Sequence, residues 1–170
     1  MARRGRIEPL SLPCVARKMS DHTRPEAWNQ FLAIAPYTGL LGMEAVSASD
    51  GGCVLALPYR EDLVGDPDSG VLHGGTITAL MDVCFGFSVY FRIKKFVPMA
   101  TLDLRIDYLR PAQPHRKVYA TANCYKLTQE LAFVRGHAYD DDPDNPVSTS
   151  VGIFMFTAGK PAFTETKMPS

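Results

Sequence analysis

The feature that most constrains the fold is a long apolar stretch from Thr76 to Phe91, which carries one charge, Asp82, near its middle. A helix that is apolar on nearly every side has to be covered on nearly every side. The stretch is too short for a comfortable membrane span, and a charge at its centre would be costly in a bilayer. It therefore predicts a central helix inside a soluble domain.

Two glycines, Gly74 and Gly75, stand at the expected start of this helix, in the run Gly70-Val-Leu-His-Gly-Gly. The first N–H groups of a helix have no partner within it, and the helix dipole favours negative charge there. An acyl carbonyl at this point would be polarised, and an oxyanion formed from it would be stabilised. The glycines can equally serve a tight turn into the helix.

The lone charge, Asp82, follows Gly75 by seven residues, close to two helical turns, so both residues share one helix face. Their separation along the axis is about 10 Å at ~1.5 Å per residue, which is too far for both to serve one carbonyl. If both act, Asp82 has to work with the helix start of another subunit, with the two helices antiparallel. Unless Asp82 is simply a solvated carboxylate, the spacing predicts a two-fold dimer with two shared sites.

The segments around this helix are shorter and alternate in polarity. They predict a short helix over residues 26–35 and strands over residues 40–47, 53–59, 100–109, 117–127, 130–139 and 147–156, with a polar loop over 60–69. In the strand over 100–109, alternation places Leu104 and Tyr108 on one face and Thr101 on the other. One apolar helix and six strands predict an α+β domain in which a curved antiparallel sheet wraps a buried helix.

The composition excludes several classes of partner and cofactor. Lys plus Arg and Asp plus Glu number 18 each, and this zero net charge argues against a nucleic-acid partner. The four cysteines are far apart and not clustered with histidines, so neither zinc nor disulfides are expected and a cytoplasmic location is predicted. The acidic run 140–145 lacks the Gly and closing Glu of an EF-hand loop and is expected to be a solvated hairpin tip.

The two chain ends differ from the middle. Residues 1–24 are rich in arginine and show no periodicity, which predicts a flexible basic tail; its prolines and Glu8 argue against a transit peptide. Residues 25–158 are expected to form one domain, and residues 159–170 a second tail.

The run from Gly70 to Asp82 and the strand from Ala100 to Ala112 resemble the signatures of hotdog-fold thioesterases of the PaaI (phenylacetic acid degradation) type. The resemblance covers roughly residues 36 to 158 and implies a hotdog fold, in which a curved six-stranded antiparallel sheet wraps one long central helix, here with a short N-terminal helix. It also implies hydrolysis of acyl-CoA thioesters without a metal or an organic cofactor.

The resemblance implies a role for each matching residue. Asp82 is implied as general base or nucleophile, the Gly74 N–H as the group that polarises the carbonyl, and Thr101 as a support for the water or the carboxylate. His73 is either a base or, as we favour, a helix-entry residue that fixes the loop. Many relatives carry Asn or Gln where this chain has Pro67, so a side-chain donor from that loop is in doubt.

The substrate-binding residues are harder to assign. CoA phosphates attract Arg or Lys, and Phe85 could line an acyl pocket. The candidate contacts are Asp68, Phe85, Arg92, Lys94, Lys95 and Arg110, although each has a plainer role as a solvated charge or a core residue.

The sequence thus predicts an acyl-CoA thioesterase that is at least a homodimer, with the pairing of two dimers left open and with neither nucleic acid nor membrane as partner. Two other functions stay open. A hotdog-fold hydratase or dehydratase needs a His and a carboxylate that converge on the acyl group, and here only His73 is near. A non-catalytic acyl-CoA-binding sensor would have no need of Asp82.

Overall fold

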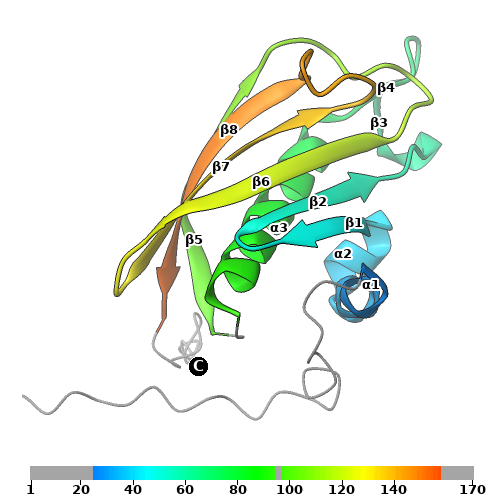
Figure 1. Cartoon of the computed structure of the whole chain (residues 1–170). Coiled ribbons are helices and arrows are strands. Elements are labelled where there is room, and N and C mark those ends of the chain that lie inside the picture. Colours follow the sequence, from blue (N-terminus) through cyan, green and yellow to red (C-terminus); the bar gives the residue numbers. More distant parts are fainter. Residues whose placement is uncertain (1–24, 95–96, 158–170) are drawn as a thin grey trace, which may run out of the picture.

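A six-stranded antiparallel sheet curves around one long helix, α3 (Gly74–Ile93), in the computed structural model, which describes residues 25–94 and 97–157 (Figure 1). The sheet has the order β1-β2-β6-β7-β8-β5. Its strands are β1 (Glu44–Ser49), β2 (Gly52–Leu57), β5 (Met99–Tyr108), β6 (Val118–Leu127), β7 (Leu131–Tyr139) and β8 (Ser148–Phe156). The predicted α+β architecture is confirmed.

Helix α3 supplies much of the core. It is long and apolar enough to cross a membrane by length and composition, a test that the core helix of a soluble protein also passes. Its buried side chains come from most of its turns and include Ile77, Leu80, Met81, Cys84 and Phe91. They pack against the concave face of the sheet, which accounts for the apolar composition of the stretch.

The Phe85 ring packs between α3 and strands β7 and β8 of the sheet. Its side chain is fully buried, and a Cβ atom added to Gly136 in β7 or Gly152 in β8 would lie 2.8 or 2.9 Å from its ring. The two strands therefore need glycine where the ring meets them, and burial of the ring contributes about 2–3 kcal/mol. The predicted contact of Phe85 with substrate is wrong, because this side chain is a core residue.

A β-bulge in β5 changes which residues face α3. The register with β8 shifts between Thr101 and Asp103, so Thr101 lies opposite the buried Phe154. One extra residue reverses the alternation that precedes it. Thr101 therefore shares the inner face with Leu104 and Tyr108, and the prediction that it lies on the opposite face is wrong.

Other differences from the sequence-based expectation lie in short elements. Helix α1 (Pro25–Ile34) is followed at once by α2 (Pro36–Leu41), because Pro36 is compatible with the first turn of a helix. Gly42, at φ 68°, ends α2, so β1 begins later than predicted. The predicted loop holds a 3₁₀ turn, η2 (Glu61–Leu63), and a small pair of strands, β3 (Val64–Asp66) and β4 (Val71–Leu72).

The predicted tails, residues 1–24 and 159–170, lie outside the described residues, as do Lys95 and residue 158.

Candidate active site

The start of α3 is capped by its own preceding residue. His73 has an extended backbone at φ −63° and ψ 130°, and its Nδ1 accepts a hydrogen bond of 2.9 Å from the Gly75 N–H. A Cβ atom on Gly75 would lie 2.9 Å from Nδ1, so a side chain there would displace the cap. His73 thus has the helix-entry role that we favoured, and Nδ1 is engaged with the backbone rather than free as a base.

The Gly74 N–H is the donor of the first turn that lines the pocket side of α3. It has no hydrogen-bond acceptor among the described residues, whereas the Gly74 carbonyl accepts a bond of 2.5 Å from the Tyr108 hydroxyl. A Cβ atom on Gly74 would lie 3.3 Å from that hydroxyl, so glycine allows Tyr108 to approach this closely. An acceptor that reaches this N–H would also meet the positive end of the helix dipole.

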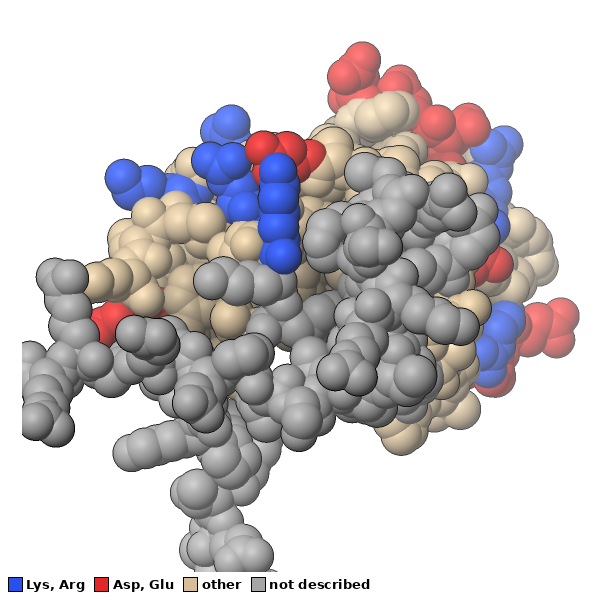
Figure 2. Space-filling model, turned by 60° about the horizontal axis from the view of Figure 1, so that its bottom comes forward, with Lys and Arg blue, Asp and Glu red and all other residues tan. Residues whose placement is uncertain are grey.

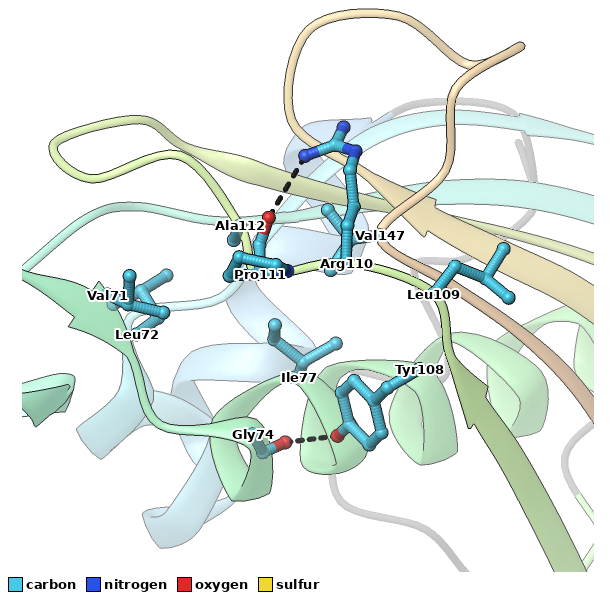
Figure 3. Close-up of a pocket in the computed structure, with 10 residues that line it drawn as sticks. All are labelled: Val71, Leu72, Gly74, Ile77, Tyr108, Leu109, Arg110, Pro111, Ala112 and Val147. Carbon is cyan, nitrogen blue, oxygen red and sulfur yellow. Dashed lines mark hydrogen bonds between the residues drawn. The ribbon is translucent and has the colours of Figure 1, made fainter.

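A pocket of about 340 Å³ adjoins this helix start (Figure 3). Most of its lining is apolar, and it consists of Val71, Leu72, Gly74, Ile77, Tyr108, Leu109, Arg110, Pro111, Ala112 and Val147. In Figure 3 the Arg110 guanidinium points away from Gly74 and Ile77. The pocket thus combines an apolar wall with one bare backbone donor, the arrangement that suits a ligand with an apolar part and a polar atom.

Asp82 forms the second part of the site. Its Oδ1 accepts a hydrogen bond of 2.7 Å from the Thr101 hydroxyl, so the structure brings this predicted pair together. Asp82 is half-buried on α3, and within the described part of the chain its Oδ2 has no hydrogen-bond partner. Thr101 therefore orients the carboxylate and leaves one oxygen free to take a proton or to attack a carbon.

One chain keeps these two parts apart. Gly74 and Asp82 are eight residues apart on the same helix, α3. Their separation along the helix axis is about 12 Å at ~1.5 Å per residue. The donor and the carboxylate of a single chain therefore cannot contact the same carbonyl group.

The predicted cation Arg110 is committed to a buried carboxylate. Its Nη2 lies 2.6 Å from Oδ1 of Asp140 and its Nη1 lies 2.9 Å from Oδ2, which also accepts a bond of 2.7 Å from the Gln113 N–H. The bond from Arg110, helped by the Gln113 N–H, outweighs burial and lowers the pKa of Asp140 to about 2. Asp140 is therefore not part of a solvated hairpin tip, as the sequence had predicted, but the anchor of Arg110.

Two of the other predicted cations, Arg92 and Lys94, lie at the far end of α3. Arg92 and Lys94 form exposed ion pairs of 3.5 and 3.7 Å with Asp50 in the turn between β1 and β2. Figure 2 shows the end of the molecule where α3 finishes, with basic side chains gathered beside acidic ones. These cations do not join Arg110, which lines the pocket at the opposite end of the helix.

Asp68 lies apart from the Gly74 pocket. It lines a separate hollow of about 440 Å³ with Tyr59, Pro67 and His115. In the same loop the Asp66 carboxylate accepts bonds from the Ser69 hydroxyl and the Asp68 N–H, which lower the pKa of Asp66. Pro67 thus lies in a loop whose conformation is held by hydrogen bonds to the Asp66 carboxylate.

The structure adds two residues that the sequence did not single out for the site. Tyr108 reaches Gly74 across 34 positions of the chain, and Thr76 donates a bond of 2.8 Å from its hydroxyl to the His73 carbonyl. Neither contact can be predicted from the spacing or periodicity of the sequence. Within the described ranges, no group of three or more His, Cys, Asp or Glu side chains lies close enough together to hold a metal ion.

Comparison with known proteins identifies relatives along most of this domain. Residues 69–147 match the family model described as the Thioesterase superfamily. The medium/long-chain acyl-CoA thioesterase YigI of Salmonella typhimurium is 28% identical over 125 residues, which cover 66% of this chain and 80% of that protein. A putative esterase of Halobacterium salinarum is 41% identical over 76 residues, and the match spans 50% of its length.

Solved structures show the same architecture. A crystal structure of a Pseudomonas aeruginosa protein is 44% identical, with a TM-score of 0.70, and covers 77% of this chain and 97% of that one. A mutant of the phenylacetic acid degradation protein PaaI from Thermus thermophilus is 27% identical, with a TM-score of 0.62, and covers 71% and 98%. Together the matches support thioester hydrolysis as the general activity. The chain belongs to the thioesterase superfamily, as a hotdog-fold protein of the PaaI-like type.

Proposed function

We propose that this protein hydrolyses acyl-CoA thioesters to a free carboxylic acid and CoA. Asp82 acts on water or on the thioester, and the Gly74 N–H of a partner subunit binds the carbonyl oxygen. The observation that carries the proposal is the 2.7 Å bond from Thr101, which orients Asp82 while its second oxygen has no partner in the described part of the chain. The acyl-CoA thioesterases among the relatives support the choice of substrate class.

The same two groups serve either of two routes. As a base, Asp82 takes a proton from water, whose oxygen bonds to the carbonyl carbon; the C–S bond then breaks and the proton passes to the leaving sulfur. As a nucleophile, an Asp82 oxygen bonds to the carbonyl carbon and displaces the thiolate, and water hydrolyses the resulting anhydride. In both routes negative charge develops on the carbonyl oxygen, where the Gly74 N–H stabilises it.

The edge of the sheet explains how a second subunit would complete the site. Among the described residues β5 is the last strand of the sheet, and none of them pairs with its other side, where another strand could add (Figure 1). Thr101, beside Asp82, and Tyr108, beside Gly74, both face α3 from this strand. Antiparallel pairing of two β5 strands about a two-fold axis between Leu104 and Arg105 would place Thr101 opposite Tyr108 of the partner subunit.

Exposed apolar side chains at this edge support the same assembly. Leu102 is 58% exposed, Tyr108 48% and Leu109 58%, and all three belong to β5 or the residue that follows it. A second copy of the chain would cover them, because the two-fold operation presents the same surface on both subunits. The dimer thus accounts for the separated halves of the site and for the open strand edge together.

A free-thiol assay over short, medium, long and aromatic acyl-CoAs tests the activity. We expect thiol release in step with loss of thioester. Binding of acyl-CoA without thiol release would instead identify a sensor. Loss of the enoyl absorbance of crotonyl-CoA without thiol release would identify a hydratase.

Mixed dimers test the sharing of the site. Gly74→Pro removes the N–H at a helix position that tolerates proline, and the extended backbone of His73 is compatible with a following proline. Gly74→Ala is the matched control, because it adds the same Cβ and keeps the N–H. Mixing Gly74→Pro subunits with Asp82→Asn subunits should restore activity, since each mixed dimer contains one intact site. If the mixed dimers are no more active than the two parent variants, the site is not shared between subunits.

A further inference from the structure

The amide group between His73 and Gly74 differs at its two ends in hydrogen bonding. Its N–H, on Gly74, has no acceptor among residues 25–94 and 97–157. Its C=O, on His73, accepts two hydrogen bonds from one residue, 3.0 Å from the Thr76 N–H and 2.8 Å from the Thr76 hydroxyl. A carbonyl that accepts an additional bond withdraws charge through the amide, so its N–H becomes a stronger donor.

The next amide group, between Gly74 and Gly75, is also held at both ends. Its N–H donates to Nδ1 of His73 at 2.9 Å, and its C=O accepts 2.5 Å from the Tyr108 hydroxyl. Tyr108 is itself tied to α3, because its hydroxyl lies 2.9 Å from that of Thr78. The N–H groups of Gly75 and Thr76 are therefore occupied, and the turn presents the Gly74 N–H alone.

We propose that Thr76 and Tyr108 are positioning residues for the Gly74 N–H as the oxyanion donor: Thr76 polarises this N–H through the His73 carbonyl, and Tyr108 fixes Gly74 in place through the Gly74 carbonyl. The inference rests on the proposed function, which assigns that N–H to the carbonyl oxygen. Both hydroxyls donate to backbone carbonyl oxygens, Thr76 to that of His73 and Tyr108 to that of Gly74, so each acts on the backbone around the Gly74 N–H. The Tyr108 ring also lines the pocket, but its hydroxyl proton is directed to the Gly74 carbonyl. A donor that is already aimed needs no reorganisation when charge develops in the transition state.

This role differs from ordinary capping in what it changes. A hydroxyl that only stabilises the start of α3 would affect the unfolding temperature and leave turnover intact. A hydroxyl that aims an oxyanion donor affects the transition state more than substrate binding, so kcat falls while KM stays the same.

The test uses variants that remove a hydroxyl and keep the shape. In Thr76→Val and Tyr108→Phe, we expect kcat to fall about tenfold with KM unchanged, a fraction of the ~100–1000-fold cost of losing an oxyanion donor outright. Thr76→Ser keeps the hydroxyl and should return kcat to near the wild-type value. Thr149→Val and Tyr125→Phe, at exposed positions on the outer face of the sheet, are the matched controls and should behave as wild type.

A second readout does not depend on activity. The ¹⁵N resonance of Gly74 responds to hydrogen bonding at the His73 carbonyl, because both belong to one amide group. In the full-length protein Thr76→Val should move this resonance upfield, and Thr76→Ser should leave it near its original position.

The outcomes separate this inference from the proposed function. Wild-type kcat in Thr76→Val, or a rise in KM alone, overturns the positioning role while thiol release by the wild type still supports thioester hydrolysis. If the wild type releases no thiol, the proposed function fails, and the Gly74 ¹⁵N resonance alone tests whether Thr76 polarises the Gly74 N–H. An unmoved resonance in Thr76→Val then overturns the inference, and an upfield shift that Thr76→Ser abolishes supports it.

Discussion

Two carboxylates beside β5 differ in how many donors surround them. Asp140 is fully enclosed and accepts three hydrogen bonds, two from Arg110 and one from the Gln113 N–H, so both of its oxygens are used. Asp82 accepts one bond, from Thr101, and among the described residues its second oxygen has no partner. A saturated carboxylate can only hold structure, whereas a carboxylate with one free oxygen is oriented and still able to react.

The two carboxylates nevertheless serve the same region. Thr101 lies near the beginning of β5, and Arg110 lies just after its end. By holding Arg110 and the Gln113 N–H, Asp140 fixes the segment over residues 109–112, which forms one wall of the Gly74 pocket. Asp140 therefore supports the shape of the pocket, whereas the proposed mechanism assigns the chemistry to Asp82.

The largest expected effect is the loss of activity in Asp82→Asn, which distinguishes Asp82 from Asp140. Asp82→Asn removes the carboxylate that, in the proposed mechanism, accepts a proton or attacks carbon, so kcat should fall about 100- to 10,000-fold. Thermal unfolding should stay close to that of the wild type, because the half-buried Asp82 has a single hydrogen bond. Thiol-release kinetics and a melting curve on the same preparation check both expectations. Full activity in Asp82→Asn would remove this residue from the mechanism.

At Asp140 we expect the reverse, a loss of stability with little loss of activity. Asp140→Asn leaves the partly buried guanidinium of Arg110 without its counter-charge, which should lower the free energy of unfolding by about 2–3 kcal/mol. Urea unfolding measures this change. Below the unfolding transition kcat should fall far less than in Asp82→Asn. A loss of activity as large as that of Asp82→Asn, with stability unchanged, would reverse the roles of the two carboxylates.

The sequence predicted much of this difference, but not all of it. The helix, the sheet and the isolation of Asp82 follow from periodicity and from one charge in an apolar stretch. The bulge that turns Thr101 inward does not, because alternation assigns it to the outer face. Asp140 was expected in a solvated tip, since the run of acidic residues gives no sign that one of them meets Arg110, 30 positions away. Contacts between distant residues decide these positions.

The pH dependence of stability sharpens the contrast at Asp140. Its pKa in the folded protein is about 2, below the ordinary value of 3.8, because Arg110 stabilises the charged form. The carboxylate therefore stabilises the fold fully above about pH 4, and this contribution, about 1–2 kcal/mol after allowance for solvent around Arg110, is lost as the pH falls toward 2. Urea unfolding between pH 5 and 2 should show the wild type approaching Asp140→Asn. A constant gap between the two would contradict the lowered pKa.

The smallest expected effect concerns the one donor to Asp82. Thr101→Val keeps the shape of the side chain and removes the hydroxyl, so the Asp82 carboxylate loses the bond that orients it. The value of kcat should fall about five- to tenfold, the equivalent of one hydrogen bond of ~1 kcal/mol. Thr101→Ser should retain most of the activity, because the hydroxyl that reaches Oδ1 is the group that matters. If valine and serine behave alike, the bond does not orient Asp82, and the free oxygen of Asp82 must be directed by the substrate itself.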